Sequence, residues 1–222
     1  MKNSKSDFSA LEIAYRQRYL TVLKHLELPL QEHVAQYLVE QPRIDRITAR
    51  AKGIDSFLAK SKNKSKSKLK YSHPLDQIQD QLGVRIITFY LSDVERLDAI
   101  VRRYFTPIEY KSRVPDSQWE FGYFGRHYVL VLPTDIIDED MSPDMLPGFF
   151  ELQIKTLFQH AWSESEHDLG YKPREAPLTD DQKRRLAFTS AQAWGADRIF
   201  NELFDERHSE QSTSNDNTMP AE

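Results

Sequence analysis

The chain has 222 residues, more than the ~150 often taken as one domain, so we expect one large domain or a domain with appendages. Its 30 Lys and Arg against 34 Asp and Glu give a formal net charge of −4, which excludes a histone-like or ribosomal-protein-like basic chain. The absence of cysteine excludes a disulfide framework, thiolate zinc sites, iron–sulfur ligation and a cysteine nucleophile. No apolar run approaches the ~20 residues that cross a membrane and no secretory signal is visible, so a cytoplasmic protein without membrane partners is expected.

The first part of the chain is predicted to be helical. Apolar residues recur at helical spacing over 8–28, and Pro29 is expected to end that helix. A second helical stretch is expected around 34–39. Together they predict an N-terminal helical segment, residues 1–44, packed on the domain that follows. Residues 46–60 are also predicted to form a helix.

A lysine block occupies residues 60–70 and reads KSKNKSKSKLK, with six lysines, three serines and no acid. A cationic stretch of this kind attracts an RNA backbone, because phosphate binding releases condensed counterions. A flexible, solvated loop explains the same composition equally well, and both interpretations stay open.

Beyond residue 80 the chain alternates between strand-like and helix-like segments. Strands are predicted at 84–90, 108–113, 126–132 and 149–155, where β-branched and aromatic residues gather. Helices are predicted after the capping sequence Ser92-x-x-Glu95, over 159–169, and after the capping sequence Thr179-x-x-Gln182. This order predicts an α+β fold with a mixed β-sheet of about five strands flanked by helices.

The end of the chain differs in composition from the rest. Residues 176–207 are expected to form a C-terminal helix. Residues 208–222 are polar and nearly free of large apolar groups, so they are predicted to be disordered.

The segment FFELQIKT, residues 149–156, carries the first candidate site. A period of two places Glu151, Gln153 and Lys155 on one face of the strand, with the apolar residues on the other. A carboxylate, an amide and an amine in a row on one sheet face indicate a polar ligand. The alternative, that this face is simply solvated, is the commoner outcome for one such strand taken alone.

Asp80 and Arg85 form the second candidate, in the segment DQLGVRI. An Asp at the entry of a strand, facing a Glu from a neighbouring strand, is a usual way to hold Mg²⁺, which prefers oxygen ligands and takes nucleotide phosphates as its others. An ordinary turn cap and its ion-pair partner would give the same two residues.

Two further groups complete the candidates. In the expected helix, Lys52, Ser56 and Lys60 are spaced i, i+4 and i+8 on one face behind Arg50, which suits a triphosphate chain, although a solvated helix face is commoner. In GYFGRHYV, Tyr123 offers a ring for stacking and His127 an imidazole for a phosphate or hydroxyl contact.

The order and spacing of these blocks resemble the synthetase domain of the RelA/SpoT family, which makes the alarmones ppGpp and pppGpp. The blocks are RxKxxxSxxxK at 50–60, DxxGxRII at 80–87, GYxxxH at 122–127, ELQIKT at 151–156 and WxxxEHDLxYK at 162–172. The resemblance implies a nucleotidyltransferase-like synthetase core over 45–175. No hydrolase-type metal-binding block precedes residue 45, so the chain resembles a small stand-alone synthetase active in the stringent response.

On the donor side, the resemblance implies that Arg50 and Arg85 sandwich the adenine of ATP, which suits planar guanidinium groups. Lys52, Ser56 and Lys60 would then hold the ATP phosphates.

On the acceptor side, the resemblance implies that Asp80 and Glu151 bind Mg²⁺ and that Glu151 helps to deprotonate the attacking 3′-hydroxyl. Tyr123 would stack on the guanine of GDP or GTP. His127 and Gln153 would lie near the acceptor's phosphate or ribose.

The expected reaction is transfer of the β,γ-pyrophosphate of ATP to the 3′-hydroxyl of GDP or GTP. The family's loop usually reads GYxSxH, and here Gly125 replaces the serine, a departure that falls on the acceptor side. A loop of this type also resembles the toxic small alarmone synthetases, which pyrophosphorylate the 3′ end of tRNA. The third alternative is a degenerate member that binds only a nucleotide or a partner, and the intact set of donor-side residues argues against it.

The partners implied are ATP, a guanosine nucleotide and, in the second alternative, tRNA. Small synthetases of the family are often homotetramers, whereas the toxic ones often act as monomers neutralised by an antitoxin. A homo-oligomer and an antitoxin complex are therefore both open.

Overall fold

The computed structural model describes residues 3–65, 68–112, 121–123, 125–170 and 177–216. The residues cluster into two compact units, each assembled from separate stretches of the chain. Unit 1 comprises 1–86, 100–111 and 127–153, and unit 2 comprises 87–99, 112–126 and 154–222. The expected boundaries at 44, 175 and 207 stay a prediction. Among the described residues, every helix is too short or too polar to cross a bilayer.

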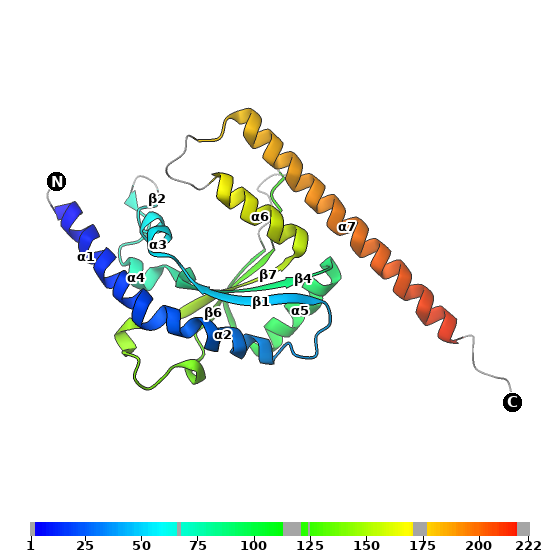
Figure 1. Cartoon of the computed structure of the whole chain (residues 1–222), viewed down its shortest axis with the longest axis horizontal. Coiled ribbons are helices and arrows are strands. Elements are labelled where there is room, and N and C mark those ends of the chain that lie inside the picture. The colour runs from blue at the N-terminus through cyan, green and yellow to red at the C-terminus, as the bar shows by residue number, and fades with distance from the viewer. Residues whose placement is uncertain (1–2, 66–67, 113–120, 124, 171–176, 217–222) are drawn as a thin grey trace. The chain divides into compact units, whose positions relative to one another are not determined.

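A five-stranded sheet with the strand order β1-β4-β7-β6-β5 forms the centre of the fold (Figure 1). Its strands are β1 (Ile44–Ala51), β4 (Leu82–Thr88), β5 (Pro107–Ser112), β6 (Arg126–Val131) and β7 (Phe149–Thr156). A second, two-stranded antiparallel sheet pairs β2 (Lys64–Ser65) with β3 (Lys68–Leu69). The predicted α+β class, with a mixed sheet of about five strands flanked by helices, is confirmed.

Helices occupy the stretches between and beyond the strands. The α-helices are α1 (Asn3–Arg18), α2 (Lys24–Gln36), α3 (Ile54–Ser61), α4 (Pro74–Gln77), α5 (Leu91–Tyr104), α6 (Leu157–Gly170) and α7 (Asp180–Asp216). Short turns are the π-helical η1 (Tyr19–Leu23) and the 3-10 turns η2 (Gln79–Gln81), η3 (Thr134–Ile136) and η4 (Pro143–Met145).

The predicted alternation along β7 is confirmed by burial. Phe150, Leu152 and Ile154 are each 0% exposed, and they form part of the core. On the opposite face, Glu151 and Gln153 are half-buried and Lys155 is buried, with its ammonium donating to Ser163 Oγ at 2.8 Å. A helix residue therefore covers the end of the polar face, and this face is not simply solvated.

The helix predicted over 46–60 is wrong for its first half. The chain forms β1 up to Ala51, and α3 begins only at Ile54, after Gly53. The β-branched residues at 44, 47 and 48 favour an extended backbone, and Gly53 adopts extended angles (φ −56°, ψ 148°) as the N-cap of α3. Lys52 consequently precedes the helix.

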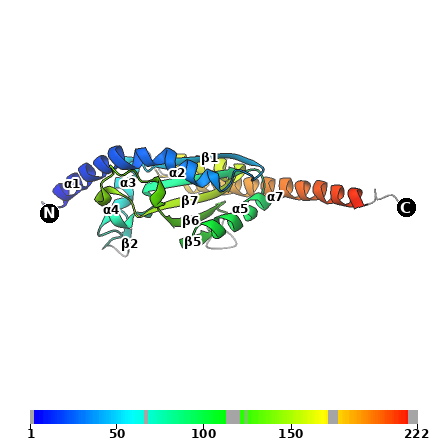
Figure 2. The same cartoon turned by 90° about the horizontal axis from the view of Figure 1, so that it is seen from below.

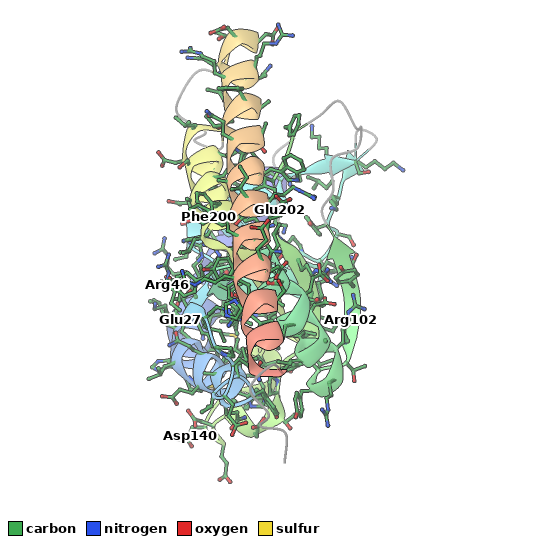
Figure 3. The ribbon with its side chains drawn as sticks, turned by 90° about the vertical axis from the view of Figure 1, so that its right-hand side faces the viewer. Glu27, Arg46, Arg102, Asp140, Phe200 and Glu202 are labelled. Atoms are coloured by element: carbon green, nitrogen blue, oxygen red, sulfur yellow. The ribbon has the colours of Figure 1, made fainter. Side chains whose placement is uncertain are left out.

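Side chains from α2 cover the free edge of β1. β1 ends the sheet, so every second backbone N–H lacks a strand partner. The Ala51 N–H donates to Glu27 Oε1 at 2.8 Å, and the Ala49 N–H donates to Gln31 Oε1 at 3.2 Å. Figure 2 shows α2 lying along β1, and Figure 3 labels Glu27. These contacts replace the missing strand.

The expected break at Pro29 is also wrong. Pro29 lies inside α2, where it removes one backbone hydrogen bond, and the helix continues because Leu26, Leu30 and Val34 are buried along one face. The irregularity falls earlier, at the π-helical turn η1.

Two predicted capping sequences have different outcomes. At α7, the Thr179 N–H donates to Gln182 Oε1 at 2.8 Å and the Gln182 N–H donates to Thr179 Oγ1 at 3.2 Å, as predicted. At α5, Asp93 caps the helix instead, by accepting from the Tyr90 N–H at 3.3 Å.

The C-terminal helix is longer than predicted. α7 begins at Asp180 and ends at Asp216, so residues 208–216, expected to be disordered, are helical. Without a glycine or proline in this stretch, the helix extends at little cost once it is nucleated. The rest of the expected tail, 217–222, lies outside the described residues.

Replacing Phe150 by Ala should lower the free energy of unfolding by ~3–5 kcal/mol, because a fully buried ring leaves a cavity between packed strands. The matched control is Phe188→Ala on α7, where the ring is 63% exposed and the change should stay within ~0.5 kcal/mol. Urea denaturation measures both. Equal losses for the two variants would contradict the assignment of β7 to the core.

Candidate functional site

Two lysines of unit 1 share one carboxylate oxygen. Asp80 lies in η2, just before β4, and its Oδ2 accepts from Lys52 Nζ at 2.9 Å and from Lys60 Nζ at 2.7 Å. Lys52 follows β1 and Lys60 lies in the last turn of α3. The structure therefore brings the two lysines together, although through a strand end and a helix end rather than through one helix face.

We call Lys52, Lys60 and Asp80 the Lys–Asp cluster, and it carries an excess positive charge. Two ammonium groups meet one carboxylate, and all three side chains are only 19–30% exposed. The second oxygen of Asp80, Oδ1, is buried and makes no hydrogen bond. A partly desolvated site with one spare positive charge and one spare acidic oxygen suits a polyphosphate with its cation.

Glu151 is the centre of a second cluster in unit 1. His127 Nδ1 donates to Glu151 Oε1 at 3.0 Å from the neighbouring strand β6, and Gln153 Nε2 donates to Glu151 Oε2 at 2.7 Å. Burial alone would raise the pKa of Glu151, but the hydrogen bonds from His127 and Gln153 and the charge of Lys60 lower it to about 2. The carboxylate is therefore held in its charged form.

Lys60 links the two clusters. Its ammonium bonds to Asp80, and its charge is also one of the causes that lower the pKa of Glu151. The neighbouring strands β4 and β7 also bring the two clusters close together. A Cβ added to Gly83 in β4, three residues after Asp80, would lie 3.8 Å from the Glu151 carbonyl oxygen in β7. Asp80 and Glu151 thus belong to one site.

Three buried polar atoms of this site make no hydrogen bond: Asp80 Oδ1, His127 Nε2 and Gln153 Oε1. A buried polar group without a partner costs about 1–3 kcal/mol, so such groups are rare in protein interiors. A polar ligand bound at this site would supply the missing partners of all three.

Two residues of α1 support the Lys–Asp cluster, and sequence reasoning missed them. The Tyr15 hydroxyl donates to the Lys52 carbonyl oxygen at 2.7 Å while its ring stacks on Phe57, with ring centroids 3.6 Å apart. Arg18 donates to Gln81 Oε1 at 3.1 Å, next to Asp80, and to the Leu75 carbonyl at 2.7 Å. The only sign of this role in the sequence was the Tyr15 hydroxyl, which stands among apolar residues at helical spacing.

The remaining donor-side candidates lie in unit 1 as well. Arg50 is exposed on β1 and Arg85 is half-buried on β4, the neighbouring strand of the sheet. Ser56 is half-buried on α3, one turn before Lys60. Their predicted contacts with adenine and phosphate stay predictions.

Tyr123, the expected stacking residue, belongs to unit 2. Its ring is 8% exposed, and its hydroxyl donates to Asp197 Oδ2 at 2.6 Å. Burial raises the pKa of Tyr123, and the charge of Asp197 raises it further, so the phenol stays protonated. No sequence pattern indicated that α7 would supply this partner.

The residues fit a magnesium ion with substrate phosphates as further ligands. Within the described ranges, no three His, Cys, Asp or Glu residues cluster in a way that would hold a metal by themselves. Asp80 and Glu151 provide two carboxylates, and Asp80 Oδ1 is unbonded. Mg²⁺ is commonly held by one or two carboxylates together with nucleotide phosphates, which is the arrangement offered here.

Comparison with known proteins adds independent evidence. The family model for the region found in RelA / SpoT proteins matches residues 49–176. The GTP pyrophosphokinase YjbM of Bacillus subtilis (strain 168) is 26% identical over 170 residues, which are 76% of this chain and 75% of that protein.

Solved structures are similar in fold. Small alarmone synthetase 1 from Bacillus subtilis matches with a TM-score of 0.64 and 22% identity, over 92% of this chain and 99% of that one. The structure of that synthetase bound to its product pppGpp matches with a TM-score of 0.62 and 23% identity, over 91% and 99% of the two chains.

Replacing His127 by Ala should raise the pKa of Glu151 from about 2, because burial remains while the strongest stabilising neighbour of the carboxylate is lost. Carbon-13 NMR of labelled glutamate, with EDTA present, measures the titration. In the native protein this carboxylate contributes stability above its ordinary pKa of 4.5, and the contribution is lost as the pH falls through about 2.

His33→Ala is the matched control, since His33 pairs with Asp135 at 2.9 Å and not with Glu151. It should leave the Glu151 titration unchanged. An unaltered midpoint in His127→Ala would show that the His127–Glu151 bond is not what keeps the carboxylate charged.

Proposed function

Because the chain belongs to the RelA/SpoT family, we propose that it is an ATP-dependent pyrophosphokinase that makes (p)ppGpp from GDP or GTP. One observation carries this proposal. Lys60 bonds to Asp80 in the Lys–Asp cluster, and its charge also acts on Glu151. Buried atoms of both clusters are without a hydrogen bond. The relative named a GTP pyrophosphokinase and the structure bound to pppGpp support the same reaction.

The donor nucleotide would occupy the Lys–Asp cluster. Lys52 and Lys60 would bind the phosphates of ATP, and Ser56 would add a hydroxyl donor on the same helix as Lys60. Arg50 and Arg85, on neighbouring strands, would hold the adenine between planar guanidinium groups.

Asp80 and Glu151 would hold Mg²⁺ together with the ATP phosphates. The ion, when bound, neutralises negative charge on the transferred group. The protein's own contribution is to keep both carboxylates in place, Asp80 through its lysines and Glu151 through His127 and Gln153.

On the acceptor side, Glu151 would orient the 3′-hydroxyl and help to remove its proton. The 3′-oxygen then forms a bond to the β-phosphorus of ATP while the bond between that phosphorus and the α-phosphate oxygen breaks, and AMP leaves. His127 Nε2 and Gln153 Oε1 would reach the acceptor's ribose or phosphate, because both atoms are buried and unbonded. Positioning and charge complementarity are what such a transfer chiefly requires.

A second acceptor, the 3′ end of tRNA, is favoured by the lysine hairpin. We use this name for residues 62–70, which begin directly after α3, the helix that carries Lys60. Within it Lys62, Lys64, Lys68 and Lys70 are exposed around the antiparallel pair β2–β3. Exposed lysines next to a phosphate site suit a nucleic-acid backbone.

Replacing Glu151 by Gln should reduce transfer at least ~10²-fold while ATP binding changes little, because the charge that orients and deprotonates the acceptor is lost. γ-Labelled ATP is incubated with GDP, GTP or deacylated tRNA, and the labelled product identifies the acceptor. Glu32→Gln, an exposed change on α2, is the control and should retain full activity. Near wild-type transfer by Glu151→Gln would remove the assigned role.

Changing the five lysines of the hairpin to Ser should reduce transfer to tRNA by ~10-fold or more at physiological salt, and should leave transfer to GDP or GTP within about twofold. Changing the same lysines to Arg keeps the charge and should restore transfer to tRNA. Equal activity of the Ser and Arg variants toward tRNA, over a range of salt concentrations, would rule out a role of the hairpin in RNA binding.

A further inference from the structure

Asp197 is a buried carboxylate in the middle of α7, outside the region matched by the family model. It is 1% exposed, and its Oδ2 accepts hydrogen bonds from the hydroxyls of Tyr123 and Thr156. A buried carboxylate is costly unless it is hydrogen-bonded, and an apolar residue would fill the same space at lower cost. The network therefore indicates a role beyond packing.

Thr156 gives this network a rigid base. It is the last residue of β7, the strand that carries Glu151 and Gln153, and it precedes α6 directly. Its backbone N–H donates to Gln159 Oε1 at 3.0 Å, and the Gln159 N–H donates to Thr156 Oγ1 at 3.0 Å. This reciprocal cap fixes the Thr156 hydroxyl, and with it the position of Asp197 relative to the end of β7.

α7 is itself held within unit 2. The ring of Phe200, one turn after Asp197 and labelled in Figure 3, stacks on Phe158 of α6. The two ring centroids are 5.7 Å apart. The Ser92 N–H at the start of α5 donates to Asn201 Oδ1 at 2.8 Å. The helix that carries Asp197 is therefore held by contacts with both α6 and α5, which fix the position of the Asp197 carboxylate.

A second close contact lies between Gly125, two residues after Tyr123, and the end of β7. A Cβ on Gly125 would lie 2.2 Å from the Ile154 carbonyl oxygen and 2.6 Å from Lys155 Cγ. Close approach, rather than a left-handed backbone, requires glycine here, since no described glycine has positive φ. The serine found at this position in the family's usual loop would not fit this backbone.

We infer that Asp197 is a positioning residue for acceptor binding: it holds the Tyr123 hydroxyl so that the acceptor loop, meaning Tyr123 and Gly125, is fixed on the end of β7, the strand that carries Glu151. The inference rests on the proposed function, in which Tyr123 contacts the acceptor base. The loop is anchored at two points, by the Tyr123–Asp197 hydrogen bond and by the Gly125 backbone against Ile154. Replacing Asp197 removes the Tyr123–Asp197 hydrogen bond and leaves the Lys–Asp cluster, where ATP would bind, unchanged.

The test is a double-mutant cycle with Asp197→Asn, Tyr123→Phe and the double variant, assayed with the guanosine nucleotide or tRNA that the native protein uses. Each single variant should raise the KM for the acceptor ~10- to 100-fold, with the KM for ATP within about twofold, because a hydrogen bond to a charged group is lost. The double variant should be no worse than Tyr123→Phe alone, since that change already removes the hydrogen bond to Asp197 together with the contact to Gln159. Glu206→Gln, an exposed change on α7, is the control.

Other results overturn the inference. Additive effects of the two changes, or equal rises in the KM values for ATP and acceptor, would mean that Asp197 acts only through overall stability. A lower acceptor KM in Asp197→Asn would mean that the bond holds Tyr123 away from the acceptor. If the native protein neither transfers to nor binds any acceptor in calorimetry, the proposed function fails and the inference fails with it. Native transfer with an unchanged acceptor KM in both variants defeats the inference alone.

Discussion

The sharing of one Asp80 oxygen by Lys52 and Lys60 is the constraint on which the site depends. Two ammonium groups this close would repel each other strongly in a partly buried place without the carboxylate between them. The bond also requires that the end of β1, the end of α3 and the turn before β4 meet at one point. Tyr15 and Arg18 support two of these three elements, since Tyr15 bonds to the backbone of Lys52 after β1 and Arg18 bonds to the side chain of Gln81 in the turn before β4.

Charges alternate through the site in the order Lys52, Asp80, Lys60 and Glu151, and Glu151 is bonded by the His127 imidazole and the Gln153 amide. Glu151 stays ionised although it is partly buried, as its low pKa shows. The net charge of −4 reveals none of it, since that number averages over the whole surface. The binding of a polyphosphate depends instead on the local order of positive and negative side chains and on how much water remains between these groups.

The sequence predicted the parts of the fold and site that depend on local pattern. Period-two alternation identified β7 and the shared face of Glu151 and Gln153, and motif spacing brought Lys52 and Lys60 together. It assigned the wrong backbone to Lys52, because alternation over eight residues that include four charged or polar side chains looks much like a helix face. It could not find Arg18 or Asp197, whose partners Gln81 and Tyr123 are 63 and 74 residues away along the chain.

The division of the chain into two interleaved units bears on how the protein is made. Unit 1 cannot be completed until residue 153 has left the ribosome, and unit 2 needs the helix that carries Asp197. During synthesis Lys52, Lys60 and Asp80, all within the first 86 residues, leave the ribosome well before Glu151. The two clusters therefore cannot be joined until β7, in the last third of the chain, has been translated.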